Sequence, residues 1–108
     1  MFTIQNDLNN IVSIIENLLP NAKIYLFGSY ANGEYNSDSD LDLCVVAPSF
    51  NMRQTDIRFM IRNAIKDKTT LPLDILTFTS DTFEERAKSK STLQYTIRNE
   101  GVLLNEQH

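Results

Sequence analysis

Two short apolar segments, residues 24–27 and 41–47, flank a polar stretch in which no crossover helix is predicted. Short runs of this kind, rich in aliphatic and aromatic residues and bounded by turn residues, are typical of β-strands. Parallel neighbours in a sheet need a crossover connection, which is usually a helix. We therefore expect these two strands to be antiparallel neighbours in one sheet.

Helical periodicity surrounds these two strands. Apolar residues recur at helical spacing over residues 4–19, with Thr3 as the expected N-cap and Pro20 as the stop. The later elements are a helix over about 52–67, a strand over 73–78, a helix that begins around 79–82, and a last helix over about 91–100 that ends at Gly101 as its C-cap.

Length and composition limit the architecture. The chain has 108 residues, of which 42% are apolar and 22% charged, as in folded proteins, and it contains no repeat, linker or low-complexity tract. We therefore expect one domain over residues 1–108. The order helix, strand, strand, helix, strand, helix, helix predicts an α/β fold with a small mixed β-sheet covered by helices.

The charge balance and the single cysteine exclude several classes of protein. The net charge is −4, which argues against direct binding of nucleic acid or an anionic membrane, because such binding needs clustered Lys and Arg. One cysteine excludes an internal disulfide and a Cys-based zinc site and fits a reducing cytosol. The start does not resemble a signal peptide, and no apolar run is long enough to span a membrane. We expect a cytoplasmic protein.

An acidic segment leads into the second strand. Asp40 and Asp42 are two residues apart, so in a strand their side chains share one face with Cα atoms about 6.6 Å apart. Such a pair repels itself unless cations neutralise it, and all-oxygen ligands favour Mg²⁺ or Mn²⁺. A solvated acidic loop is the alternative interpretation. Four carboxylates fall within nine residues here, with no basic residue among them: Glu34, Asp38, Asp40 and Asp42.

Two common motifs do not fit this segment. Gly28–Gly33 has the glycine spacing of a P-loop, but Glu34 stands where the phosphate-binding lysine belongs. An EF-hand loop that begins at Asp38 would need glycine where Leu43 stands. The sequence therefore predicts neither motif.

The segment does match a Gly-Ser pair, ten intervening residues and an Asp-x-Asp that enters an apolar strand, here Gly28-Ser29 and Asp40-Leu-Asp42. This pattern resembles the nucleotidyltransferase superfamily that includes DNA polymerase β. The short chain resembles the minimal nucleotidyltransferase (MNT) branch, whose members act as antitoxins beside HEPN-domain toxins. The resemblance covers nearly the whole chain, including the closing Glu100-Gly-Val-Leu-Leu.

The resemblance implies a polymerase β-like fold and roles for five residues. Gly28 would let the backbone approach a triphosphate, and Ser29 would donate its hydroxyl and amide to the phosphates. Asp40 and Asp42 would hold two Mg²⁺ ions, and Asp74 on a later strand would be the third metal-binding and catalytic carboxylate.

Two positions modify this expectation. Asp74 is flanked by Leu73 and Ile75, where an acidic side chain is otherwise unexpected, although an edge-strand carboxylate that points into water is the alternative. Asn32 stands where family members often have arginine, which removes one potential phosphate contact.

The resemblance also implies an enzyme that transfers AMP from Mg-ATP to a hydroxyl of a cognate HEPN-type toxin and so neutralises it. Two alternatives stay open. The chain could be a non-catalytic binding module that neutralises its partner by contact alone, or a nucleotidyltransferase that acts on a small-molecule hydroxyl. The sequence leaves open the acceptor residue, the number of AMP units, the nucleotide preference and the oligomeric state.

Other polar and reactive residues carry weaker signals. Arg58, Arg62 and Lys66 recur every four residues on a predicted helix, which indicates a solvated face or, less often, a contact with phosphate or an acidic partner. Tyr30 and Tyr35 are expected to cover apolar surface, with stacking on a base as the alternative. Loop tyrosines and such basic stripes are common, so neither observation predicts a function.

Overall fold

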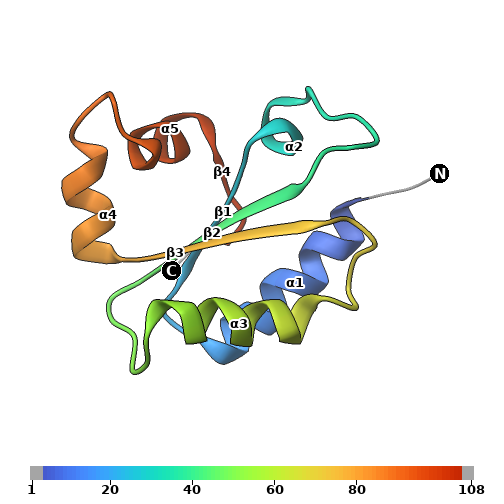
Figure 1. The fold of residues 1–108 in the computed structure, drawn as a ribbon, viewed down its shortest axis with the longest axis horizontal. Coiled ribbons are helices and arrows are strands. Elements are labelled where there is room, and N and C mark those ends of the chain that lie inside the picture. Colours follow the sequence, from blue (N-terminus) through green and yellow to red (C-terminus); the bar gives the residue numbers. More distant parts are fainter. Residues whose placement is uncertain (1–3, 106–108) are drawn as a thin grey trace.

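The computed structural model describes residues 4–105, which form a four-stranded sheet between two layers of helices (Figure 1). No helix among these residues is long and apolar enough to cross a membrane. The elements in chain order are α1 (Ile4–Leu18), β1 (Lys23–Phe27), α2 (Ser29–Asn32), β2 (Leu41–Ala47), α3 (Gln54–Ile65), β3 (Leu73–Thr79), α4 (Ser80–Ala87), α5 (Leu93–Glu100) and β4 (Val102–Leu103).

The strands lie in the order β3-β2-β1-β4. Strands β1 and β2 are antiparallel neighbours, which confirms the expectation from the missing crossover helix. Strands β2 and β3 are parallel, and α3 provides the crossover that a parallel pair requires. The sheet is therefore mixed and the fold is α/β, as predicted.

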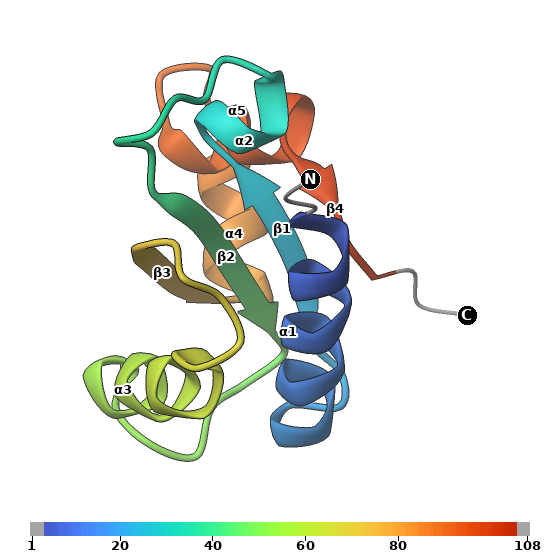
Figure 2. The same ribbon diagram turned by 90° about the vertical axis from the view of Figure 1, so that its right-hand side faces the viewer.

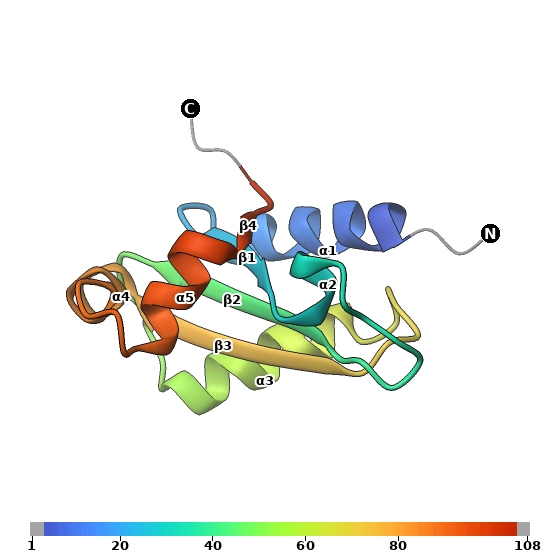
Figure 3. The ribbon, with the colours of Figure 1, turned by 90° about the horizontal axis from the view of Figure 1, so that it is seen from above.

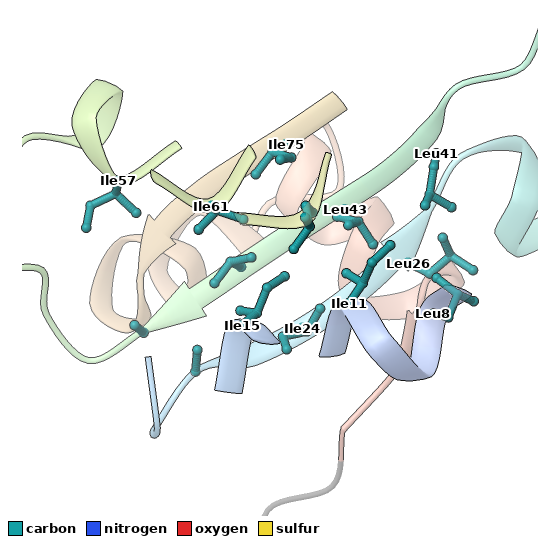
Figure 4. Close-up of a cluster of buried hydrophobic side chains, with 14 residues drawn as sticks. Leu8, Ile11, Ile15, Ile24, Leu26, Leu41, Leu43, Ile57, Ile61 and Ile75 are labelled. Carbon is teal, nitrogen blue, oxygen red and sulfur yellow. The ribbon is translucent and has the colours of Figure 1, made fainter. Parts of the chain in front are cut away.

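Strand β2 is buried on both faces because helices cover each side of the sheet (Figure 2). Leu43 points toward α1 and α3, where it packs among isoleucines such as Ile11 and Ile61 (Figure 4). Val45 belongs to the same cluster. The residue between these two, Cys44, points the other way, into a second cluster under α4 and α5. Alternation along β2 therefore divides the core into two layers.

The two ends of the sheet are covered differently. Figure 3 shows α4 and α5 over one end, while α2 and the loop that follows it lie at the other. Helix α4 begins where the sequence predicted, since Thr79 is its N-cap and accepts a hydrogen bond from the Thr82 amide. The predicted N-cap Thr3 lies outside the described residues.

The structure corrects two details of the sequence prediction. Residues 29–32, expected to be loop, form the single turn α2, and the two-residue strand β4 was not predicted. Gly101 is the C-cap of α5, as expected, with a φ of −77°. Glycine is needed there because a Cβ atom would overlap the backbone oxygen of Ile97.

A buried amide side chain holds the C-terminal segment against β1. Asn105 accepts a hydrogen bond from the Ile24 amide at 2.8 Å and donates one to the Ala22 carbonyl at 2.8 Å. The neighbouring Leu104 amide donates to the Ile24 carbonyl at 2.7 Å. The Asn105 side chain thereby extends the short ladder between β1 and β4, which no local sequence pattern predicts.

We predict that Asn105→Ala lowers the free energy of unfolding by about 1–3 kcal/mol, because it removes the side-chain acceptor of the buried Ile24 amide. Urea unfolding followed by circular dichroism measures this change. Asn99→Ala is the control, since the exposed Asn99 side chain donates a hydrogen bond within its own helix α5, to the Tyr95 carbonyl. Equal effects of the two substitutions would contradict the structural role of Asn105.

Candidate active site

Two of the predicted carboxylates are brought together by the register of the sheet. Asp42 on β2 lies opposite Phe27 on β1 and opposite Asp74 on β3. Directly opposed residues in neighbouring strands place their side chains on the same face. By alternation from Cys44, this is the face that α4 and α5 cover at its other end.

The Asp42 and Asp74 side chains lie close enough for their negative charges to repel each other. Partial burial raises the pKa of Asp42 to about 6, and the negative charges of Asp74 and Asp40 add to the increase. The site is therefore a cluster of carboxylates without an internal counter-charge.

Gly28 makes room for this cluster. Its φ of 75° is in the left-handed region, and a Cβ atom on it would overlap Oδ2 of Asp42. The Asp42 carboxylate therefore lies directly against the backbone between β1 and α2. Ser29 is the first residue of α2 and is half-buried beside Gly28.

The predicted five-residue set is only partly assembled. Gly28 lies directly against Asp42, and Asp74 is near Asp42. Asp40 is exposed and just precedes β2. Among residues 4–105, no group of three or more His, Cys, Asp or Glu side chains is arranged to hold a metal ion. The oxygen-only donor set and its uncompensated charge nevertheless fit Mg²⁺ chemically, with Asp40, Asp42 and Asp74 as the candidate ligands.

Side chains that the sequence analysis did not assign also border the site. A small cavity of about 100 Å³ beside Gly28 is lined by Asn32 and by Thr96 and Glu100 of α5. On the opposite side of Asp42, Arg58 and Arg62 of α3 lie along the same groove as Asp74. These residues are distant in sequence from the Asp-x-Asp segment, so only the sheet order could reveal their proximity.

The structure also places the single cysteine and the two loop tyrosines. Cys44 is fully buried, and burial raises the pKa of its thiol to about 12, so it is a core residue. Tyr30 packs against the core and stacks on Tyr35 with ring centroids 4.5 Å apart. Tyr30 therefore covers apolar surface as expected, while Tyr35 remains more than half exposed.

We predict that Asp42→Asn stabilises the metal-free protein at pH 7.5 by about 1 kcal/mol, a value reduced for solvent screening. The raised pKa means that the folded state holds a proton that the unfolded state releases above pH 3.8. The contribution of Asp42 to stability is therefore present below pH 3.8 and lost as the pH rises through about 6. Asparagine resembles the protonated form at every pH.

Urea unfolding from pH 3.5 to pH 8 measures the difference between wild type and variant. The difference should grow between about pH 4 and pH 6 and then stay constant. Asp38→Asn, in the exposed loop before β2, is the control and should show no such growth. A pH-independent difference for Asp42→Asn would contradict the shifted pKa.

Comparisons with known proteins place this geometry in a family. The model of the nucleotidyltransferase domain family matches residues 8–99, while no individually curated protein matches the chain. A solved protein assigned as a minimal nucleotidyltransferase superimposes with a TM-score of 0.64 at 21% identity, over 92% of this chain and 90% of its own.

Two solved toxin–antitoxin structures have the same fold. One contains AMP-PNP and matches with a TM-score of 0.58 at 23% identity, over 93% of this chain and 73% of its own. The other, a mutant of MntA–HpeT, matches with a TM-score of 0.57 at 21% identity and the same coverage. The family match over most of the chain is the stronger finding. The chain belongs to the nucleotidyltransferase domain family, whose members are transferases that generally use a nucleoside triphosphate and a divalent metal ion.

Proposed function

We propose that the chain is a cytoplasmic antitoxin that transfers AMP from Mg-ATP to a hydroxyl of a HEPN-type toxin and thereby neutralises it. The observation that carries this proposal is the cross-strand pair of Asp42 and Asp74, with Asp40 close by and Gly28 directly against Asp42. The family match and the toxin–antitoxin neighbours support the reaction and the partner class.

The mutant neighbour adds a specific argument for the Asp-x-Asp segment. In that toxin–antitoxin mutant, two aspartates that are two positions apart were changed to glutamate. Asp40 and Asp42 have the same spacing in this chain. We infer that this pair is the functional centre of the site.

The residues around Asp42 have complementary roles in this proposal. Gly28 lets the backbone approach the triphosphate, and Ser29 donates its hydroxyl and amide to phosphate oxygens. Asp40, Asp42 and Asp74 hold two Mg²⁺ ions, which when bound neutralise phosphate charge and activate the acceptor hydroxyl. Their binding would also relieve the repulsion that raises the pKa of Asp42.

The transfer step itself is a displacement at phosphorus. The acceptor oxygen forms a bond to the α-phosphorus, and the bond between that phosphorus and the pyrophosphate oxygen breaks. Asp74 is exposed at the edge of the site, so it can take the proton that the acceptor hydroxyl loses. The products are an acceptor that carries AMP, and pyrophosphate.

We predict that Asp74→Ala lowers single-turnover transfer by about 10²–10⁴-fold, the usual contribution of a general base, and changes ATP affinity little. Nucleotide affinity should persist because Asp40 and Asp42 remain. The assay uses ATP labelled at the α-phosphate, Mg²⁺ and a HEPN-type protein as the acceptor. Asp38→Asn is the matched control and should retain transfer.

Three outcomes separate the alternatives. Label retained on the partner, with a matching increment in its intact mass, supports transfer to a protein. A partner that binds and is neutralised without label would identify a non-catalytic binding module. Transfer within a few-fold of wild type for Asp74→Ala would remove that carboxylate from the site.

We predict that Gly28→Ala abolishes stabilisation of the protein by Mg-ATP, whereas Gly33→Ala preserves it. Both glycines have a positive φ, so alanine strains the backbone at each by about 1–2 kcal/mol. Only at position 28 does the new Cβ meet Asp42, whereas open space surrounds Gly33. Thermal melting with and without Mg-ATP measures both variants, and equal loss of the response would contradict the role of Gly28.

A further inference from the structure

An open groove runs along the outer edge of the sheet, beside the candidate active site. It has a volume of about 610 Å³ and lies between α3 and β3. Arg58, Phe59 and Arg62 line it from α3, and Asp74 lines it from β3. Asp74 therefore borders the groove at the edge of β3, while its side chain lies with Asp42 on the face of the sheet opposite α3.

The two arginines are held in place without a carboxylate partner. Arg62 donates to the Leu73 carbonyl at 3.0 Å, and Arg58 donates to Oγ1 of Thr77 at 3.5 Å. Neither forms an ion pair with any carboxylate among residues 4–105. A guanidinium has five donors, so most donors of each arginine are available to a ligand. The groove thus presents fixed positive charge on a chain whose net charge is −4.

The edge of β3 adds polar backbone and apolar surface. The Leu41 amide donates to the Pro72 carbonyl, so the backbone carbonyl of residue 72 points toward β2. Backbone groups alternate in direction along a strand, so those of Leu73 and Ile75 face the open edge. Phe59 lies beside them with 70% of its surface exposed. This combination suits a polypeptide segment better than a small anion.

The order of the strands places the groove on the acceptor side of the site. Gly28 and Ser29 follow β1, on one side of Asp42, and the groove lies beyond β3 on the other side. A triphosphate bound at Gly28 and Ser29, as proposed above, leaves the β3 side to the second substrate. The positive charge of Arg58 and Arg62 then faces the incoming acceptor.

We propose that this groove docks a polypeptide segment of the acceptor in which acidic side chains flank the modified hydroxyl. Arg58 and Arg62 bind the acidic side chains and Phe59 contacts an apolar one. The segment then crosses the open edge of β3, so that the hydroxyl reaches Asp74 on the other face of the sheet. The proposal rests on the transfer reaction proposed above. It adds the chemistry by which the acceptor is recognised.

The test uses three synthetic peptides that share a central hydroxyl residue and one leucine, flanked by Glu, Lys or Ala. Binding is measured by amide chemical shifts of the full chain, and transfer by label from Mg-ATP. The Glu peptide should bind about tenfold more tightly than the Lys peptide, since charge complementarity sets specificity, and should shift resonances of α3 and β3. Equal binding of the three peptides would overturn the proposal.

Charge-reversal variants locate the effect. Arg58→Glu with Arg62→Glu should raise the KM for the Glu peptide about tenfold, with kcat and the KM for ATP within about threefold. Lys66→Glu with Lys68→Glu makes the same change in net charge outside the groove and should have little effect. Arg58→Gln with Arg62→Gln is the milder variant if the reversal does not fold.

The outcomes distinguish this proposal from the function on which it rests. Equal effects of the arginine and lysine variants, or a loss of ATP binding in the arginine variants, would overturn the groove assignment. Normal transfer with unchanged KM in the arginine variants would also overturn the groove assignment, but it would not contradict the proposed transfer reaction. Glu-peptide binding at α3 and β3 without transfer to any acceptor would support the groove and contradict the reaction.

Discussion

The proximity of the carboxyl groups of Asp42 and Asp74 depends on the register between β2 and β3. One residue of slip between β2 and β3 would turn one side chain to the opposite face of the sheet and separate the pair. Burial of β2 on both faces prevents such a slip, because it would also turn Leu43 out of its layer of the core. The acidic site is therefore held together by the apolar packing beneath it.

Uncompensated charge at the end of a strand is unfavourable, and the raised pKa of Asp42 reflects it. The exposure of two of the three carboxylates limits this unfavourable repulsion. Asp40 and Asp74 are exposed to water, and only Asp42 is half-buried against Gly28. A site of this kind is less stable empty than a neutral one, and it gains most from a ligand that brings positive charge.

Strand order also gives the site two different sides. On the β1 side, Gly28 and α2 offer close backbone, and on the β3 side, Arg58 and Arg62 of α3 offer fixed guanidinium groups. Because the two sides of the site differ chemically, each side can bind a different substrate. The parallel crossover through α3 brings the basic face of that helix to the outer edge of β3.

The Asp-x-Asp segment, the antiparallel pair β1–β2 and most helices could be predicted from sequence, because spacing, periodicity and turn residues are local properties. Helix α2 and strand β4 could not, since one turn or two residues are too short for a periodic pattern and depend on their tertiary neighbours. The same holds for Asn105, for the proximity of Asp42 and Asp74, and for the two arginines near this pair. Residue types and their spacing determined which chemistry the chain can offer, but only strand register decided which of these groups meet, because it joins residues that are remote along the chain.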